Sequence, residues 1–101
     1  MEVFTRILKA AVDAHASDIH IKVGGPVVLR ISRQLVAIEA PIPTPEWTDK
    51  VVQHIVPHHM KKHFEDAREA DFSYLIAGIG RFRTNVFQQR GELAISMPTW
   101  T

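Results

Sequence analysis

Hydrophobic residues near the start of the chain recur at spacings of three and four. These apolar positions are Val3, Phe4, Ile7, Leu8, Ala11 and Val12. Such spacing puts apolar side chains on one face of a helix, so it predicts an amphipathic helix over roughly residues 2–15. The stretch 18–23 instead alternates polar and apolar residues. Alternation is the period of a half-buried strand, and it predicts that Ile19 and Ile21 face the core.

Two more strands and then two helices are predicted in the middle of the chain. A Gly-Gly-Pro turn precedes a hairpin of residues 27–31 and 35–38. Thr44, Pro45 and Glu46 combine a hydroxyl cap, a proline at the first helical position and an acid in the first turn. They predict a helix that begins at Pro45 and ends near residue 56. Pro57 breaks it, and a further helix is expected from residue 58 to about residue 67.

The last third of the chain alternates again in three stretches separated by glycine-containing turns. The strands predicted there are residues 71–76, 81–89 and 93–97. Short turns within each group of strands favour antiparallel pairing. The order of elements therefore predicts an α+β domain, in which about six antiparallel strands form one sheet with helices packed on one face.

Composition narrows the class of protein. A chain of 101 residues that is 46% hydrophobic is one domain with a real core. Twelve Lys and Arg against eleven Asp and Glu argue against a strongly basic nucleic-acid binder. There is no cysteine, which excludes disulfides, thiolate zinc sites and cysteine nucleophiles. The aromatic residues expected in the core are Trp47, Phe64, Phe72 and Phe82.

Histidines suggest a metal site at first sight. Four of the six lie within residues 54–63, and His59 and His63 are spaced to share a helix face. The chain lacks the HExxH pattern of zinc proteases. The simpler interpretation is a polar helix face that also carries Lys61 and Lys62. We therefore predict no metal site.

Asp18 and His20 form a second candidate pair. They are two residues apart on a predicted strand, so both point to the same face. A catalytic triad also needs a positioned nucleophile, and Ser17 points to the opposite face. We expect no catalytic residue in this chain. The structural interpretation is that Asp18 bonds the backbone where the first helix meets the first strand.

Arginines are the stronger candidates for chemistry. Arg81 and Arg83 share one face of a predicted strand, Arg30 lies on another strand and Arg90 at a turn. Several guanidinium groups on one sheet can bind phosphate, because each offers paired donors to anionic oxygens. The alternative is a solvated face whose arginines pair with carboxylates. The acidic partners available nearby are Glu69, Asp71 and Glu92. No P-loop is present, so this chain cannot by itself bind and hydrolyse a nucleotide in that manner.

Several motifs, in this order, carry a family resemblance. They are ASDIHI, VVLRIS, FEDAREADFSY and GIGRFRTNVFQQRGELAISMP. Together they resemble the N-terminal domain of PilT-type pilus-retraction ATPases, part of the secretion ATPase family of type II and type IV systems. The resemblance implies a PAS-like domain over residues 1–98 and the start of an interdomain linker at residues 99–101. It also implies a RecA-like ATPase domain that this chain lacks, so we expect an excised domain rather than a natural one-domain protein.

The resemblance also implies a function for the full-length protein. That protein would be a hexameric ATPase of twitching motility or secretion that binds ATP and Mg²⁺, whereas this domain alone would bind neither. Its arginines Arg30, Arg81, Arg83 and Arg90 would approach the phosphates of ATP on a RecA-like domain. The expected partners are the RecA-like domains of its own and the neighbouring subunit, and a platform protein of the inner membrane, with no nucleic acid. The expected location is cytoplasmic and peripheral to the inner membrane through those partners. In this family, Asp18 and His20 are structural motif residues.

Two positions depart from the family pattern. Members usually carry Val-Asp-Gly at the first hairpin turn, where this chain has Ile31-Ser32-Arg33. Without glycine we expect a longer or bulged hairpin. Members also usually carry an arginine where this chain has Met97. The alternative function is a stand-alone PAS-like adaptor that binds a small ligand between sheet and helices.

Overall fold

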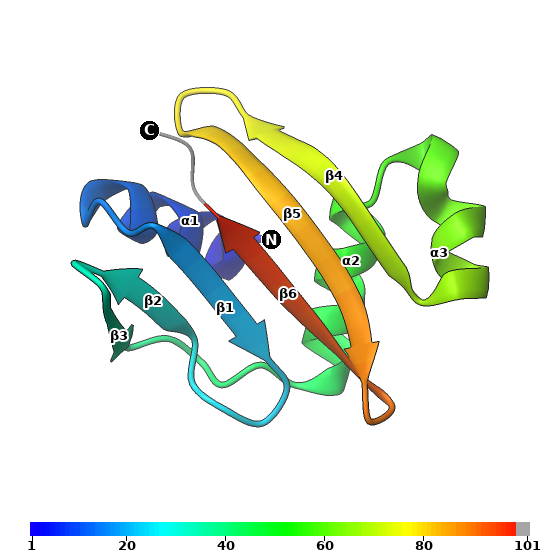
Figure 1. Cartoon of the computed structure of the whole chain (residues 1–101), viewed down its shortest axis with the longest axis horizontal. Helices are drawn as coiled ribbons and strands as arrows, with labels where there is room; N and C mark the ends of the chain where they lie inside the picture. Colours follow the sequence, from blue (N-terminus) through cyan, green and yellow to red (C-terminus); the bar gives the residue numbers. More distant parts are fainter. Residues whose placement is uncertain (99–101) are drawn as a thin grey trace.

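A computed structural model describes residues 1–98 of the chain (Figure 1). The helices are α1 (Glu2–Asp13), α2 (Pro45–Ile55) and α3 (Lys61–Ala67), with a 3-10 turn η1 (His58–Met60) before α3. The strands are β1 (Asp18–Lys22), β2 (Val28–Ile31), β3 (Gln34–Ala37), β4 (Glu69–Ile76), β5 (Gly80–Gln89) and β6 (Glu92–Pro98). The linker predicted at residues 99–101 lies outside the described residues.

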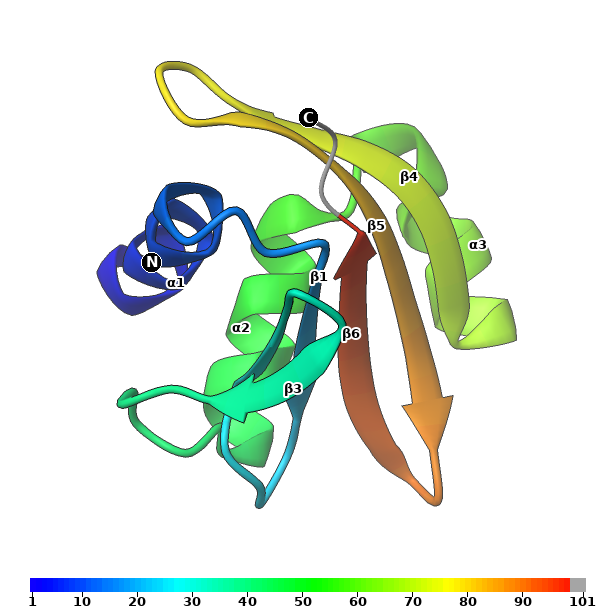
Figure 2. The ribbon, with the colours of Figure 1, turned by 60° about the vertical axis from the view of Figure 1, so that its left-hand side comes forward.

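All six strands join in one antiparallel sheet of order β3-β2-β1-β6-β5-β4. The helices α1 and α2 lie on one face of this sheet, and α3 lies beside β4 (Figure 2). No helix formed by residues 1–98 lies over the other face, and we call it the open face. The predicted α+β class, with about six antiparallel strands and helices on one face, is confirmed. None of the helices formed by residues 1–98 is long and apolar enough to cross a membrane.

The core lies between the sheet and the helices. Alternate strand residues, among them Ile19 and Ile21, are fully buried as predicted. They pack against α1 through Phe4, whose ring lies 6.5 Å from Trp47 and 6.1 Å from Tyr74 between centroids. Three of the four predicted core aromatics are buried, and Trp47 packs against the core from its edge.

The start of α2 confirms its predicted cap. The side chain of Thr44 accepts a hydrogen bond from the backbone N–H of Trp47 at 3.0 Å. Pro45 is the first helical residue, where its missing N–H has no partner to lose. The next predicted helix begins instead as η1 after Pro57, before α3.

The β2–β3 hairpin is tighter than expected. Ile31 pairs directly with Gln34, so only Ser32 and Arg33 form the turn. Their φ angles are 50° and 69°, and positive φ at both central residues is characteristic of a type I′ turn. The expectation of a longer or bulged hairpin was wrong, because this turn matches the twist of the strands strongly enough to hold two non-glycine residues in the left-handed region.

Met97 is fully buried in the core. It alternates with outward-facing residues of β6, so its side chain points toward the helices. A residue at position 97 of this strand therefore cannot place a side chain on the open face. Met97 fills the core, where an unpaired charged side chain would be costly to bury.

Candidate functional site

The end of the β4–β5 hairpin extends beyond the rest of the sheet. Strand β5 pairs with β4 as far as Gly80, but its described pairs with β6 stop at Asn85. Figures 1 and 2 show this two-stranded extension rising past the end of β6. It carries Arg81, and Arg83 lies at its base, level with Pro98 at the end of β6 by the register of Asn85 with Ser96.

Alternation along β5 fixes where the two arginines point. Phe82 is 1% exposed and Thr84 fully buried, which anchors one face of the strand against the core. The hydroxyl of Thr84 donates to the backbone carbonyl of Phe82 at 3.2 Å, so this buried polar group is satisfied. Arg81 and Arg83 must then lie on the open face, as predicted from their spacing.

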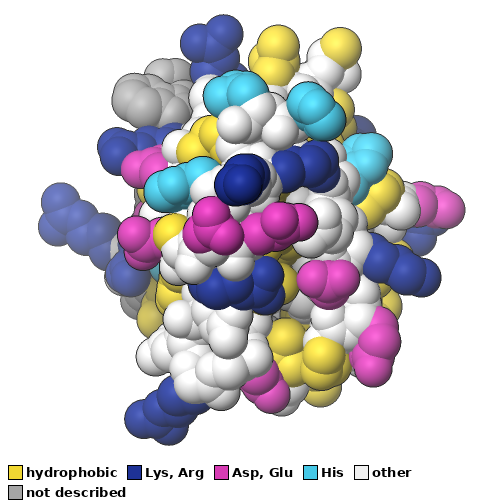
Figure 3. All heavy atoms as spheres, turned by 90° about the vertical axis from the view of Figure 1, so that its right-hand side faces the viewer, with side chains coloured by type: hydrophobic (Ala, Val, Ile, Leu, Met, Phe, Trp, Pro, Cys, Tyr) yellow, Lys and Arg dark blue, Asp and Glu magenta, His cyan; other side chains and the backbone are white. Residues whose placement is uncertain are grey.

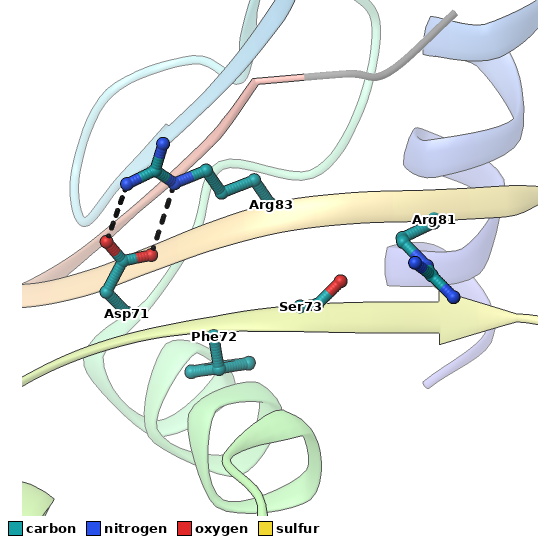
Figure 4. A pocket seen from close by; sticks show the side chains of 5 residues that line it. All are labelled: Asp71, Phe72, Ser73, Arg81 and Arg83. Atoms are coloured by element: carbon teal, nitrogen blue, oxygen red, sulfur yellow. Dashed lines mark hydrogen bonds and ion pairs between the residues drawn. The ribbon is translucent and has the colours of Figure 1, made fainter.

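A hollow of about 590 Å³ lies at this place. It is lined by Asp71, Phe72, Ser73, Arg81 and Arg83. Figure 4 shows Asp71 and Arg83 turned toward each other on one side of the hairpin, with Phe72 on the helix side. We call this hollow the arginine hollow. It combines two guanidinium groups, one hydroxyl and one carboxylate.

Arg83 is held by a two-pronged contact with Asp71. Its Nη2 lies 3.0 Å from Oδ2 of Asp71, and its Nε lies 3.5 Å from Oδ1. The hydrogen bond to Asp71, and next the charge of that carboxylate, raise the pKa of the Arg83 guanidinium. The guanidinium of Arg81 makes no hydrogen bond or ion pair with any side chain of residues 1–98. The pairing of arginines with carboxylates, which the sequence left open, therefore applies to Arg83 and not to Arg81.

Arg30 lies in a different part of the open face. Its Nε is 3.3 Å from Oδ2 of Asp18, which also accepts a hydrogen bond from the Ser17 hydroxyl at 2.9 Å. The backbone N–H of Ser17 donates to the carbonyl of Arg30 at 2.8 Å. Asp18 was expected to bond the backbone at this junction, and it bonds side chains instead. The reason is register: Asp18 and Arg30 are direct cross-strand partners.

Strand order separates the four candidate arginines. Arg30 on β2 and Arg83 on β5 have β1 and β6 between them, which puts their backbones about 14 Å apart at ~4.8 Å per strand. Arg81 and Arg90 lie near opposite ends of β5, about 30 Å apart at ~3.3 Å per residue. The fold thus brings together only Arg81 and Arg83.

Two further hollows of the open face contain Lys22, which we did not single out from the sequence. One of about 430 Å³ is lined by Lys22, His20 and Arg30 together with apolar residues. The other, about 190 Å³, is lined by Lys22, Arg90 and Glu92 among others. The alternation of Asp18, His20 and Lys22 along one strand was the signal that could have identified this residue.

Histidines are frequent on the side of the molecule that carries α3 and β4. Figure 3 shows them there among basic and acidic side chains. Within residues 1–98, no three or more His, Asp or Glu side chains lie close enough together to hold a metal ion.

Comparison with known proteins finds similarity to ATPases of type IV pili over most of this chain. No family model matches it. Two proteins of Pseudomonas aeruginosa are similar: the type IV pilus retraction ATPase PilT, 32% identical over 92 residues, and the type IV pilus ATPase PilU, 28% identical over 87 residues. These matches cover 90% and 86% of this chain, but only 27% of PilT and 23% of PilU. The chain thus spans about a quarter of the length of these relatives.

Solved structures of related ATPases are also similar to this chain. The crystal structure of the pilus retraction motor PilT with bound ADP superposes with a TM-score of 0.85 at 34% identity, covering 95% of this chain and 28% of that one. The Legionella pneumophila ATPase DotB superposes with a TM-score of 0.80 at 20% identity, covering 97% of this chain and 28% of that one. At that identity, the likeness to DotB shows the shared fold alone.

Proposed function

Because this chain matches the N-terminal domain of PilT-type pilus-retraction ATPases, we propose that it acts as that domain in a motor ATPase of type IV pili and twitching motility. The observation that carries the proposal is the match to PilT, which reaches 32% identity over 90% of the chain. The full-length protein would add a RecA-like domain that binds ATP and Mg²⁺, as the ADP in the PilT structure suggests for that relative.

The arginine hollow gives this domain its part in the reaction. Charge develops on the transferring phosphate, and a guanidinium that approaches it stabilises the transition state, as an arginine finger does. Arg81 and Arg83 stand on the open face of a hairpin that extends beyond the sheet. A RecA-like domain that docks there would bring its ATP phosphates within reach of both. Arg30 and Arg90 would contact phosphate only at other places on the same surface.

The assembly follows from this role. We infer a homo-hexamer, in which each N-terminal domain contacts the RecA-like domains of its own and of the neighbouring subunit. The domain would move as a rigid body when nucleotide state changes. The motion would act on a platform protein of the inner membrane. The motor would then be located in the cytoplasm, at the surface of that membrane. Nearly balanced charge supports a protein partner rather than nucleic acid.

The test begins with the reading frame and continues with turnover. Continuation past Thr101 into a GxxxxGK[ST] motif is the expected result, whereas a stop codon there would favour a stand-alone adaptor. In the full-length protein, Arg81→Ala and Arg83→Ala are expected to lower ATP turnover by at least about tenfold. Lys9→Ala is the matched control, because the one side-chain partner of Lys9 within residues 1–98 is Asp13, on exposed helix surface. Wild-type rates in all four arginine variants, at positions 30, 81, 83 and 90, would refute the phosphate role.

A further inference from the structure

Arg81 and Arg83 lie in the same hollow on the same strand, yet they are not equivalent. The Arg83 guanidinium is engaged through Nε and Nη2 by the carboxylate of Asp71, whereas the Arg81 guanidinium has no side-chain partner among residues 1–98. Asp71 is also the sole carboxylate among the residues that line this hollow. Among residues 1–98, an anion that enters the hollow therefore meets one guanidinium without a side-chain partner, one engaged guanidinium and one like charge.

We propose that Asp71 is a positioning residue that competes with phosphate for Arg83, so that Arg83 offers its paired Nε and Nη2 donors to a phosphate group only after it exchanges partners. This inference rests on the proposed phosphate role of the hollow and adds to it how that role is controlled. Arg81 can then contact phosphate without giving up a partner, whereas Arg83 must first exchange Asp71 for phosphate at those paired donors. Asp71 sets how readily the exchange occurs.

The geometry of the contact makes the two anions alternatives. A carboxylate and a phosphate both present paired oxygens that accept parallel hydrogen bonds from a guanidinium. Arg83 has five N–H donors, and the contact with Asp71 engages the Nε and Nη2 edge. The donors of Nη1 stay available, so a phosphate can approach Arg83 before Asp71 leaves it.

The ion pair between Arg83 and Asp71 is largely exposed to solvent, so little free energy is needed to open it. The side chains of Arg83 and Asp71 are 61% and 50% exposed, and ion pairs this exposed contribute little to the stability of a fold. Phe72, by contrast, is only 8% exposed, and it anchors this part of β4 between Asp71 and Ser73. The backbone of the hollow is therefore fixed, while the ion pair above it can open without unfolding anything.

Register explains why Asp71 reaches Arg83 and not Arg81. Ser73 is the direct cross-strand partner of Arg83, and Asp71 sits diagonally from it, opposite Asn85. Diagonal neighbours on one face of a sheet lie within reach of long side chains. Arg81 lies two residues nearer the β4–β5 turn than Arg83 and is opposite Leu75. The side chain of Leu75 is 64% exposed and offers no hydrogen-bond acceptor.

Inorganic pyrophosphate is the probe, titrated into the 101-residue chain, which has a hydrophobic core of its own. Binding is followed by the NMR signals of the Nε–H groups of Arg81 and Arg83. Asp71→Asn is expected to tighten binding about three- to tenfold, since it removes a like charge a few ångströms from the anion and frees Arg83. Asp71→Glu keeps the carboxylate, so it is expected to bind pyrophosphate with an affinity near that of the wild type.

A double variant separates competition from simple repulsion. In an Arg83→Gln background, Asp71→Asn should no longer tighten binding beyond about twofold, because the guanidinium that it frees is gone. Asp13→Asn is the matched control: it removes the same charge from an exposed helix position paired to Lys9, and no change in affinity is expected. An Asp71→Asn variant that binds like wild type, or a gain that persists in full without Arg83, overturns the inference.

These results can be told apart from failure of the proposed function. If Asp71→Asn tightens pyrophosphate binding but the arginine variants of the full-length protein turn over ATP normally, the competition stands and the motor role of the hollow falls. If the arginine variants lose turnover but Asp71→Asn changes neither affinity nor the Arg83 signal, the motor role stands and the competition falls.

Discussion

The type I′ turn of the β2–β3 hairpin permits a sharp test of backbone strain. Arg33 holds φ at 69°, and its exposed side chain makes no hydrogen bond or ion pair with residues 1–98. A non-glycine residue in the left-handed region costs about 1–2 kcal/mol. Glycine removes that cost but adds unfolded-chain entropy worth about 0.4–1 kcal/mol. The difference predicts that Arg33→Gly raises the free energy of unfolding by about 0.5–1 kcal/mol, measured by urea denaturation.

Two variants make this prediction specific. Arg33→Ala keeps the Cβ atom and should stay within about 0.5 kcal/mol of wild type, because the strain is in the backbone. Arg68→Gly relieves a similar φ of 57° but loses the hydrogen bond from Nε to Gln88 Oε1 at 2.7 Å and the stacking of the guanidinium on Phe64, so it should show no gain. A fall in stability on Arg33→Gly, or an equal rise in Arg33→Ala, would refute the strain argument.

Two further predictions concern other parts of the fold. Thr44→Ala removes the oxygen that accepts from the Trp47 N–H, and it should lower the free energy of unfolding by about 1 kcal/mol, while Thr44→Ser should preserve it. Partial burial disfavours the phenolate of Tyr74 and raises its pKa above 10.0. The folded chain therefore holds this proton more tightly than the unfolded chain, so stability should fall as pH rises past 10.0. Phenolate absorbance of this single tyrosine, titrated in buffer and in guanidinium chloride, should give a higher midpoint in the folded chain.

Local pattern was enough to predict most elements of this fold. Spacing of apolar residues identified α1, and alternation identified β1, because each signal depends only on residues close in the chain. The cap at Thr44 located the start of α2 for the same reason. The class of fold then followed from the order of elements and the short turns.

Pairing between distant segments was not accessible in this way. Strand β1 pairs with β6, from the opposite end of the chain, and no local signal specifies that contact. The β2–β3 turn was wrongly predicted for a related reason. Serine and arginine side chains disfavour a positive φ at residues 32 and 33, but the pairing of Ile31 with Gln34 across the turn outweighs that local preference. The contact between Asp71 and Arg83 likewise depends on the register of β4 with β5, which sequence alone left open.

Register also limits how the arginines can share nucleotides. Arg81 lies near the start of β5 and Arg90 in the turn just after its end, so their backbones are about 30 Å apart at ~3.3 Å per residue. This distance is longer than a triphosphate chain, and a strand in a fixed sheet cannot shorten it. Two such residues cannot contact the same phosphates from one copy of the domain. In a ring, however, each subunit has two neighbours, and opposite ends of one sheet can face different ones. If both arginines contact ATP in the proposed hexamer, they contact nucleotides of different subunits, and one domain then links two sites through a single rigid sheet.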